Sequence, residues 1–197
     1  MAENSYAELM SLAIEPVPLN GKEALLRATV GVVARGGLRS LTYRAVAAEA
    51  GVSHGLVRHH FGSRDQLVAD ALTYAVEESL VLSNMRMQEP TIDEFAQSLV
   101  RLTEAERELQ MFQYELLLES RRRPELAPAV RTYYEAYETA ISDQLSRIGV
   151  RDEQLARLVW FTLDGLVFKQ LVFPGDVSGV LDKLRDEIRR SLTSSRS

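Results

Sequence analysis

The sequence predicts an all-α protein of about nine helices. Apolar residues recur every three or four positions through nearly the whole chain, which is the period of an amphipathic helix. No segment shows the alternation of apolar and polar residues that marks a half-buried strand. Seven of the 11 glycines lie in residues 21–62, and no proline stands between Pro18 and Pro90. The N-terminal third is therefore predicted to hold several short helices, and the remainder to hold longer ones.

The first helix is predicted to end at the Gly36-Gly37 pair, because glycine readily adopts the left-handed backbone that follows a helix C-terminus. The apolar residues before this pair fall on one helical face, which marks a helix that packs on a core. They are Leu25, Leu26, Thr29, Val30, Val32 and Val33.

Two short helices are predicted next, over about residues 43–50 and 54–60. Each follows a residue type that caps helix N-termini, Thr42 in the first case and Ser53 in the second. At both caps an apolar residue stands one position before and another four positions after, which is the spacing of a hydrophobic staple. Gly51 permits a tight turn between the two helices. This arrangement is a helix-turn-helix, with an inward set of Val46, Val52, Val57 and Phe61.

Longer helices are predicted for the rest of the chain, and capping boxes of the pattern Ser/Thr-x-x-Glu/Gln open three of them. These boxes lie at Ser63–Gln66, Thr91–Glu94 and Thr103–Glu106. The first of these helices is expected over about residues 64–84, and the third is expected to end before Pro124. A further helix ends at Gly149, and the last two span about residues 152–172 and 176–192. Residues 1–18 and 194–197 are expected to be loose ends.

The charge of the chain is unevenly distributed. The net charge is −5, from 23 basic and 28 acidic residues. Seven basic and two acidic residues give residues 21–64 a net charge of +5, which leaves −10 for the remainder. The 3 histidines of the chain all lie in residues 54–60, and no acidic residue occurs between Ala50 and Arg64. A helix that enters the DNA major groove avoids carboxylates and offers hydrogen-bond donors, so the second short helix fits that role.

Composition and motifs exclude several other functions. Because the chain contains no cysteine, it can form no disulfide, thiolate zinc site or cysteine-bound iron–sulfur cluster. No apolar stretch approaches the roughly 18 residues that a membrane span needs. Three acidic residues precede Lys22, the first basic residue, so no secretory signal is predicted and a cytoplasmic location is expected. No nucleotide-binding glycine loop, HExxH motif or nucleophile elbow occurs, so neither enzymatic activity nor a cofactor is predicted.

The histidines are not predicted to bind a metal ion. His54, His59 and His60 are spaced by five residues and one residue on a short helix without acidic residues. Metal-binding pairs on a helix are typically spaced by four residues, with a carboxylate or thiolate nearby.

The run TYRAVAAEAGVSHGLVRHHFGSRDQLVADAL resembles the N-terminal domain of the TetR family of bacterial transcriptional regulators. The similarity covers about residues 20–72. It includes the A-x-x-A-G-V-S core, the aromatic residue before the next helix cap and the S-[KR]-[DE]-x-L opening of the long helix. One position departs from the pattern, since Arg58 stands where the family most often has tyrosine.

The resemblance implies a homodimer that binds double-stranded palindromic operator DNA and that a small-molecule effector releases. It implies a DNA-facing set of Tyr43, Arg44, Ser53, His54, Gly55, Leu56, Arg58, His59, His60 and Arg64. Within this set, the cationic side chains Arg44, Arg58, His60 and Arg64 are expected to contact phosphates. His54, Gly55 and His59 are expected to approach base edges, and Leu56 could contact a thymine methyl group.

The resemblance also implies three parts of the chain: a flexible extension over residues 1–18, a DNA-binding domain over 19–66 and an effector-binding and dimerisation domain over 67–197. Candidate pocket residues are aromatic, apolar and acidic side chains of the last part, around a largely apolar effector. They are Met111, Tyr114, Glu115, Leu118, Tyr133, Tyr137, Trp160, Phe161, Asp164 and Phe168. The two carboxylates lie close in helical phase to apolar neighbours, where an unpaired charge is costly. Each is expected to pair with a cation or to lie at a solvated edge, and the alternative is that it orients a ligand donor.

Dimerisation is expected through the last two helices, about 152–172 and 176–192, whose apolar faces are broad. A DNA-binding regulator that represses transcription until an effector binds is the favoured interpretation. An activator or a ligand-independent regulator would carry the same DNA-binding domain. A helical protein–protein interaction module is the more distant alternative.

Overall fold

The computed structural model describes residues 21–86, 90–95 and 107–194 of the 197-residue chain. All regular structure in these ranges is helical, which confirms the all-α prediction. The helices are α2 (Gly21–Gly36), η1 (Leu38–Ser40), α3 (Tyr43–Ala50), α4 (His54–Phe61), α5 (Arg64–Leu82), α7 (Arg107–Glu119), η2 (Pro124–Leu126), α8 (Ala127–Ile148), α9 (Glu153–Val172) and α10 (Ser178–Ser194).

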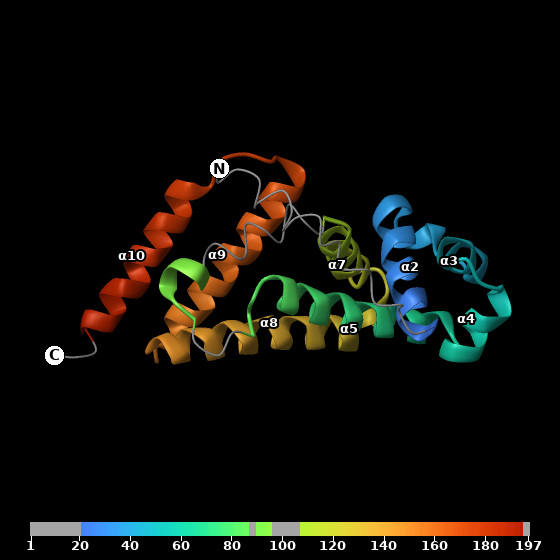
Figure 1. Cartoon of the computed structure of the whole chain (residues 1–197), viewed down its shortest axis with the longest axis horizontal. Coiled ribbons are helices and arrows are strands. Elements are labelled where there is room, and N and C mark those ends of the chain that lie inside the picture. The colour runs from blue at the N-terminus through green and yellow to red at the C-terminus, as the bar shows by residue number, and fades with distance from the viewer. Residues whose placement is uncertain (1–20, 87–89, 96–106, 195–197) are drawn as a thin grey trace, which may run out of the picture.

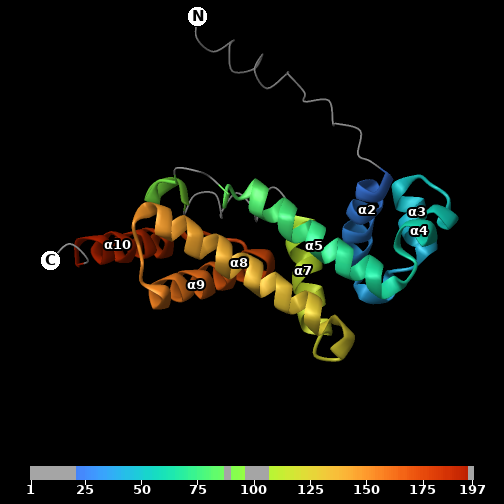
Figure 2. The same ribbon diagram turned by 90° about the horizontal axis from the view of Figure 1, so that it is seen from below.

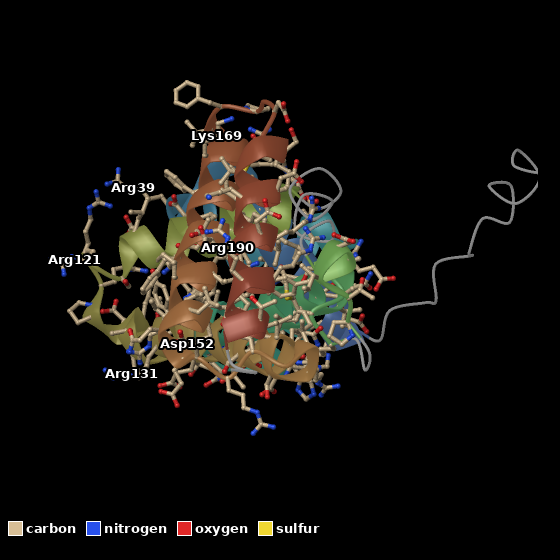
Figure 3. All side chains as sticks on the ribbon, turned by 90° about the vertical axis from the view of Figure 1, so that its left-hand side faces the viewer. Arg39, Arg121, Arg131, Asp152, Lys169 and Arg190 are labelled. Atoms are coloured by element: carbon tan, nitrogen blue, oxygen red, sulfur yellow. The ribbon has the colours of Figure 1, made fainter. Side chains whose placement is uncertain are left out.

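The molecule is elongated, and its two ends have different architecture. Helices α2, α3 and α4, with η1 between α2 and α3, form one end, which we call the head, and α9 and α10 form the other (Figure 1). Helices α5 and α8 lie side by side along the long axis and join the two ends (Figure 2). Figure 3 views the molecule from the α9–α10 end, where Asp152 and Lys169 lie near opposite ends of α9. The part of the chain outside the head is called the body.

Local capping interactions form the head largely as the sequence predicts. The Thr42 side chain accepts a hydrogen bond from the backbone N–H of Ala45, and Gly51 ends α3 in the left-handed conformation with φ +67°. Ser53 occupies the predicted N-cap position of α4, and its side chain makes no capping hydrogen bond there. The Ser53 hydroxyl therefore stays exposed and available at the head surface.

The helix boundaries of the body also follow local signals. Thr91 and Glu94 form the predicted reciprocal capping box, with the Glu94 N–H donating to Thr91 Oγ1 at 3.2 Å and the Thr91 N–H donating to Glu94 Oε2 at 3.3 Å. Gly149 ends α8 with φ +106°, and Asp152 caps α9 by accepting from two backbone N–H groups. The predicted box at 103–106 and the loose ends at 1–18 lie outside the described residues.

One hydrophobic core runs through both ends of the described structure. It includes Leu25 and Val57 in the head and Phe112, Ile141 and Ile188 in the body, all at most 1% exposed. Helix α2 packs against both α5 and α7, and α5 extends from the head into the body. The expected boundary between residues 66 and 67 falls inside α5, and it stays a prediction. In the described ranges, no helix has both the length and the apolarity needed to cross a membrane.

Candidate functional site

The outer surface of α4 is polar and cationic. His54, Gly55, Arg58, His59 and His60 are exposed, whereas Leu56 is half-buried. Val57 and Phe61 are buried on the opposite side, as is Val46 of α3, so the hydrophobic staples hold α4 against the head core. Val52, also predicted to point inward, is half-buried against that core. This packing leaves the predicted base-reading residues His54, Gly55 and His59 exposed.

Three arginines of the head surface, Arg39, Arg44 and Arg58, have no intramolecular partner among the described residues. The side chains of Arg44 and Arg58 are exposed, and no described residue forms a hydrogen bond or ion pair with either guanidinium. Tyr43 lies beside them, with its hydroxyl donating to the carbonyl oxygen of Gly62 at 3.1 Å. Unpaired cations on an exposed helix can bind phosphate without first breaking an internal interaction.

Other basic side chains of the head already have acidic partners. Lys22 Nζ lies 2.9 Å from a carboxylate oxygen of Asp70. The Arg35 guanidinium binds Glu49 at 2.7 Å and Glu108 at 2.8 Å, and these carboxylates raise the pKa of Arg35. The local charge of +5 therefore overstates the cationic surface that faces outward.

Arg64 has a structural role that the sequence did not reveal. Its guanidinium donates to the carbonyl oxygen of Leu38 at 2.7 Å and, through Nε, to that of Leu41 at 3.3 Å. Desolvation lowers the pKa of Arg64, and the positive charge of Arg123 adds to the effect. These contacts hold η1 and the start of α3 against the N-terminus of α5. The predicted phosphate contact by Arg64 competes with them.

Glu115 joins the body to the head instead of lining a pocket. Its carboxylate accepts a hydrogen bond from the backbone N–H of Leu38 at 3.0 Å. Leu38 is only 2% exposed, so the bond lies at a packed junction between α7 and η1. Glu108, on the same helix, binds Arg35 of α2. Helix α7 thus holds the head at two points. The two contacts join residues 77 and 73 positions apart, so the sequence alone could not reveal them.

A small cavity of about 20 Å³ lies between α7, α8 and α9. It is lined by Met85, Gln110, Tyr114, Tyr133, Tyr137, Ile141, Trp160, Leu163, Asp164 and Val167. Five of the predicted pocket residues are in this set: Tyr114, Tyr133, Tyr137, Trp160 and Asp164. A cavity of this size holds about one water molecule.

The acidic residue of this cavity is bound by phenol groups. The Tyr114 hydroxyl donates to a carboxylate oxygen of Asp164 at 2.7 Å. Burial raises the pKa of Asp164, and hydrogen bonds from Tyr114 and Tyr133 oppose that shift. Burial likewise raises the pKa of both phenols, which therefore remain neutral donors.

A buried polar network supports the opposite wall of the cavity. The Tyr137 hydroxyl donates to Gln113 Oε1 at 2.9 Å, and the Gln113 side-chain amide donates to Ser79 Oγ at 2.9 Å. The amide of Gln110 also donates to Ser79, at 3.1 Å. The Tyr137 ring stacks on Trp160 with centroids 5.1 Å apart, so α5, α7, α8 and α9 are linked around the cavity.

The remaining predicted pocket residues do not line this cavity. Met111, Leu118, Phe161 and Phe168 are exposed, and Glu115 faces the head. The correction has a simple helical reason, because Trp160 points inward and the next residue along a helix is rotated by about 100°. Phe161 is consequently 64% exposed on the outer surface of α9.

The outer surface of α9 carries an apolar stripe, formed by Leu158, Phe161, Phe168 and Val172. These residues follow helical spacing and each is at least 47% exposed. An apolar groove of about 430 Å³ lies beside this stripe, between α9 and α10. Its walls are Leu158, Thr162, Gly179, Val180, Lys183, Leu184 and Glu187. Contiguous apolar surface of this kind marks a site of association.

Across residues 21–86, 90–95 and 107–194, no three histidine, aspartate or glutamate side chains gather so that they could hold a metal ion. His59 and His60 contact each other edge to face, with ring centroids 5.7 Å apart.

A helix-turn-helix head joined to an all-helical body defines the class of DNA-binding transcriptional regulators. Residues 25–71 match the profile of bacterial regulatory proteins of the tetR family. Residues 86–194 match the profile of the tetracyclin repressor-like C-terminal domain. The chain therefore belongs to the TetR family, as its sequence motifs indicate, and proteins of this family are generally non-enzymatic.

Solved structures of other proteins resemble most of the chain. A transcriptional regulator from Rhodococcus sp. Rha1 is 26% identical with a TM-score of 0.67, covering 89% of this chain and 97% of that one. A TetR family member from Streptomyces coelicolor A3 is 26% identical with a TM-score of 0.66, covering 87% and 98%. The multidrug binding protein EbrR, complexed with proflavin, is 25% identical with a TM-score of 0.57, covering 86% and 98%. A search of curated protein sequences gave no significant match.

Proposed function

We propose that this chain is a ligand-responsive repressor. It acts in the cytoplasm as a homodimer on a palindromic operator and leaves the DNA when a small molecule enters the body. The observation that carries the proposal is the position of α7. Tyr114 of this helix lines the cavity, and the next residue, Glu115, binds the backbone of the head.

DNA binding is assigned to the exposed surface of α4 and the adjoining residues of α3. The cationic side chains of Arg44 and Arg58 and the exposed Ser53 hydroxyl bind phosphates. His54 and His59, both exposed and five residues apart on α4, approach base edges in the major groove. Because α4 carries no carboxylate, it can enter the groove without repulsion from phosphate.

Release of DNA follows from the size and the walls of the cavity. A space of about 20 Å³ cannot hold a small-molecule ligand, so binding must move α7 away from α8 and α9. That movement displaces Glu115 and Glu108, and with them the η1 and α2 segments of the head. The ligand and the operator then favour different head positions, and each weakens binding of the other by linkage.

Dimerisation is assigned to the apolar stripe of α9 and the groove beside α10. Burying Phe161 and its exposed apolar neighbours against a second copy removes apolar surface from water. A two-fold axis through this surface pairs the two heads, which can then bind half-sites about 34 Å or more apart.

The ligand-binding role of the body is supported by a relative of similar fold. Structures of this relative, the multidrug binding protein EbrR, were solved in complex with imidazole and with proflavin. It covers 86% or more of this chain in both structures, including the body helices.

Replacing Arg58 with alanine tests the DNA-binding assignment. The probe is a duplex selected by the protein from a random-sequence library, and affinity is measured by fluorescence anisotropy over a range of salt concentrations. Loss of one phosphate contact per protomer should weaken binding and reduce the slope of log K against log salt by about 1 per contact. The matched control is Arg151→Ala, in the exposed turn between α8 and α9 at the end of the molecule away from the head. Equal affinities and slopes for the two variants would contradict the assignment.

Replacing Phe161 with glutamate tests the dimer surface. Light scattering at micromolar concentration should show a dimer for the natural chain and a monomer for Phe161→Glu. Leu118→Glu, an equally exposed apolar residue of α7, should leave the dimer intact. A dimer that survives Phe161→Glu would place the interface elsewhere.

A further inference from the structure

The cavity between α7, α8 and α9 has an unusual charge for an apolar space. Asp164 is its one carboxylate, and no lysine, arginine or histidine is among its described lining residues. Two phenols bind the carboxylate, but no described cation forms an ion pair with it or lowers its pKa. A buried carboxylate without a cation is costly, which is why burial raises its pKa.

Aromatic rings surround this carboxylate. Tyr133 lies with its ring centroid 5.0 Å from that of Tyr137 and 6.4 Å from that of Trp160. Tyr114, whose hydroxyl donates to the carboxylate, contacts Phe168 edge to face with ring centroids 5.1 Å apart. The faces of tyrosine and tryptophan rings attract cations within about 6 Å of their centroids, and desolvation strengthens the attraction.

We propose that the ligand of this cavity is an organic cation, a quaternary or protonated amine with apolar substituents. Its charge is neutralised by Asp164, and its substituents lie against Trp160, Tyr133 and Tyr114. The inference rests on the proposed function insofar as the cavity is the effector site. It goes further because it assigns the charge of the ligand and the residue that selects it.

A second surface with acidic residues is an alternative binding site for the same class of ligand. A groove of about 570 Å³ between α5 and α8 is lined by Glu77, Glu135 and Asp143, together with Arg86 and Arg147. Arg86 already forms an ion pair with Glu77, and two arginines nearly balance the three acids. This groove therefore has a weaker preference for a cation than the cavity does. Asp143 provides a control of the same residue type.

The test compares benzyltrimethylammonium with neopentylbenzene, in which carbon replaces the charged nitrogen and the shape is kept. Binding is followed by the fluorescence of Trp160, the one tryptophan of the chain, and by calorimetry. The natural chain should bind the cation more tightly than the neutral isostere. Asp164→Asn keeps the acceptor for Tyr114 but removes the charge, and it should weaken cation binding by about ten-fold or more. Binding of the isostere should change little, and Asp143→Asn should bind like the natural chain.

Two outcomes would overturn the inference. One is equal affinity of the natural chain for the cation and its isostere, and the other is loss of cation binding in Asp143→Asn instead of Asp164→Asn. Thermal denaturation of each variant without ligand shows whether it folds. With ligand, the bound cation should raise the Tm of the natural chain and of Asp143→Asn, but not that of Asp164→Asn.

DNA release is measured separately, so the two proposals can fail independently. Cation binding through Asp164 with unchanged operator affinity would refute the ligand-responsive function and leave the cation site standing. Release of DNA by the isostere but not by the cation would refute the cation site and leave the function standing.

Discussion

The hydrogen bond between Glu115 and Leu38 offers a direct measure of how firmly the body holds the head. The Glu115 carboxylate accepts from the Leu38 backbone N–H at 3.0 Å, and Leu38 is 2% exposed. Replacing Glu115 with alanine leaves this N–H without its acceptor in a packed junction. An unsatisfied buried donor costs about 1–3 kcal/mol, which for a chain of this size lowers the Tm by about 2–12 °C.

The assay is urea and thermal denaturation of Glu115→Ala, Glu115→Gln and Glu108→Ala. Glutamine keeps an acceptor oxygen but loses the charge, so its stability should lie between those of the alanine variant and the natural chain. Glu108 lies on the same helix and forms an exposed ion pair with Arg35, which contributes little to stability. Glu108→Ala should therefore remain close to the natural chain.

The reasoning would be refuted if Glu115→Ala and Glu108→Ala were equally stable. Equal stability would mean that water or another acceptor satisfies the Leu38 N–H at no cost. The same variants also test the proposed coupling through α7. Glu115→Ala should respond less to an effector in DNA binding, because the head no longer follows the helix that lines the cavity.

Three further predictions concern single positions. Gly51→Ala should lower the free energy of unfolding, measured by urea denaturation, by about 1–2 kcal/mol. The cost comes from the left-handed backbone at φ +67°, since the added Cβ would meet no atom within 4 Å. Tyr137→Phe should cost about 1–3 kcal/mol in the same assay, since Gln113 Oε1 loses its buried donor; a change within error would show that the network rearranges. Asp164→Asn should raise the Tm of the unliganded protein at neutral pH, because burial raises the pKa of Asp164 and the ionised carboxylate disfavours the folded state. This gain should shrink as the pH falls through the raised pKa and vanish below the ordinary value of 3.8; a gain independent of pH would exclude the charge as its cause.

The interactions that the sequence determined are local. The Thr42 cap, the Gly51 turn and the Thr91–Glu94 box each connect residues within four positions of one another, and they form as predicted. The spacing of apolar residues likewise located the helices, because one helical face must be buried wherever the fold places it. Family membership could be predicted for the same reason, since the motifs that indicate it are short and lie in and directly after one helix-turn-helix.

The roles of single polar residues needed the tertiary structure. Ser53 has the right residue type and position for a cap, but its hydroxyl makes no capping bond. Arg64 was expected to face phosphate, and its guanidinium is bound to carbonyls of Leu38 and Leu41. Helical phase alone does not say which element approaches a side chain from outside the helix.

The division between local and tertiary information is clearest on α7 and α9. The sequence identified Tyr114, Trp160 and Asp164 as inward residues, because their apolar surroundings repeat with the helical period. It could not separate them from Glu115 and Phe161, since neighbouring residues of an amphipathic helix share a broad face. The packing of α7 on η1, across 77 residues of sequence, made Glu115 hold the head, and the packing of α7 on α9 placed Asp164 at the cavity.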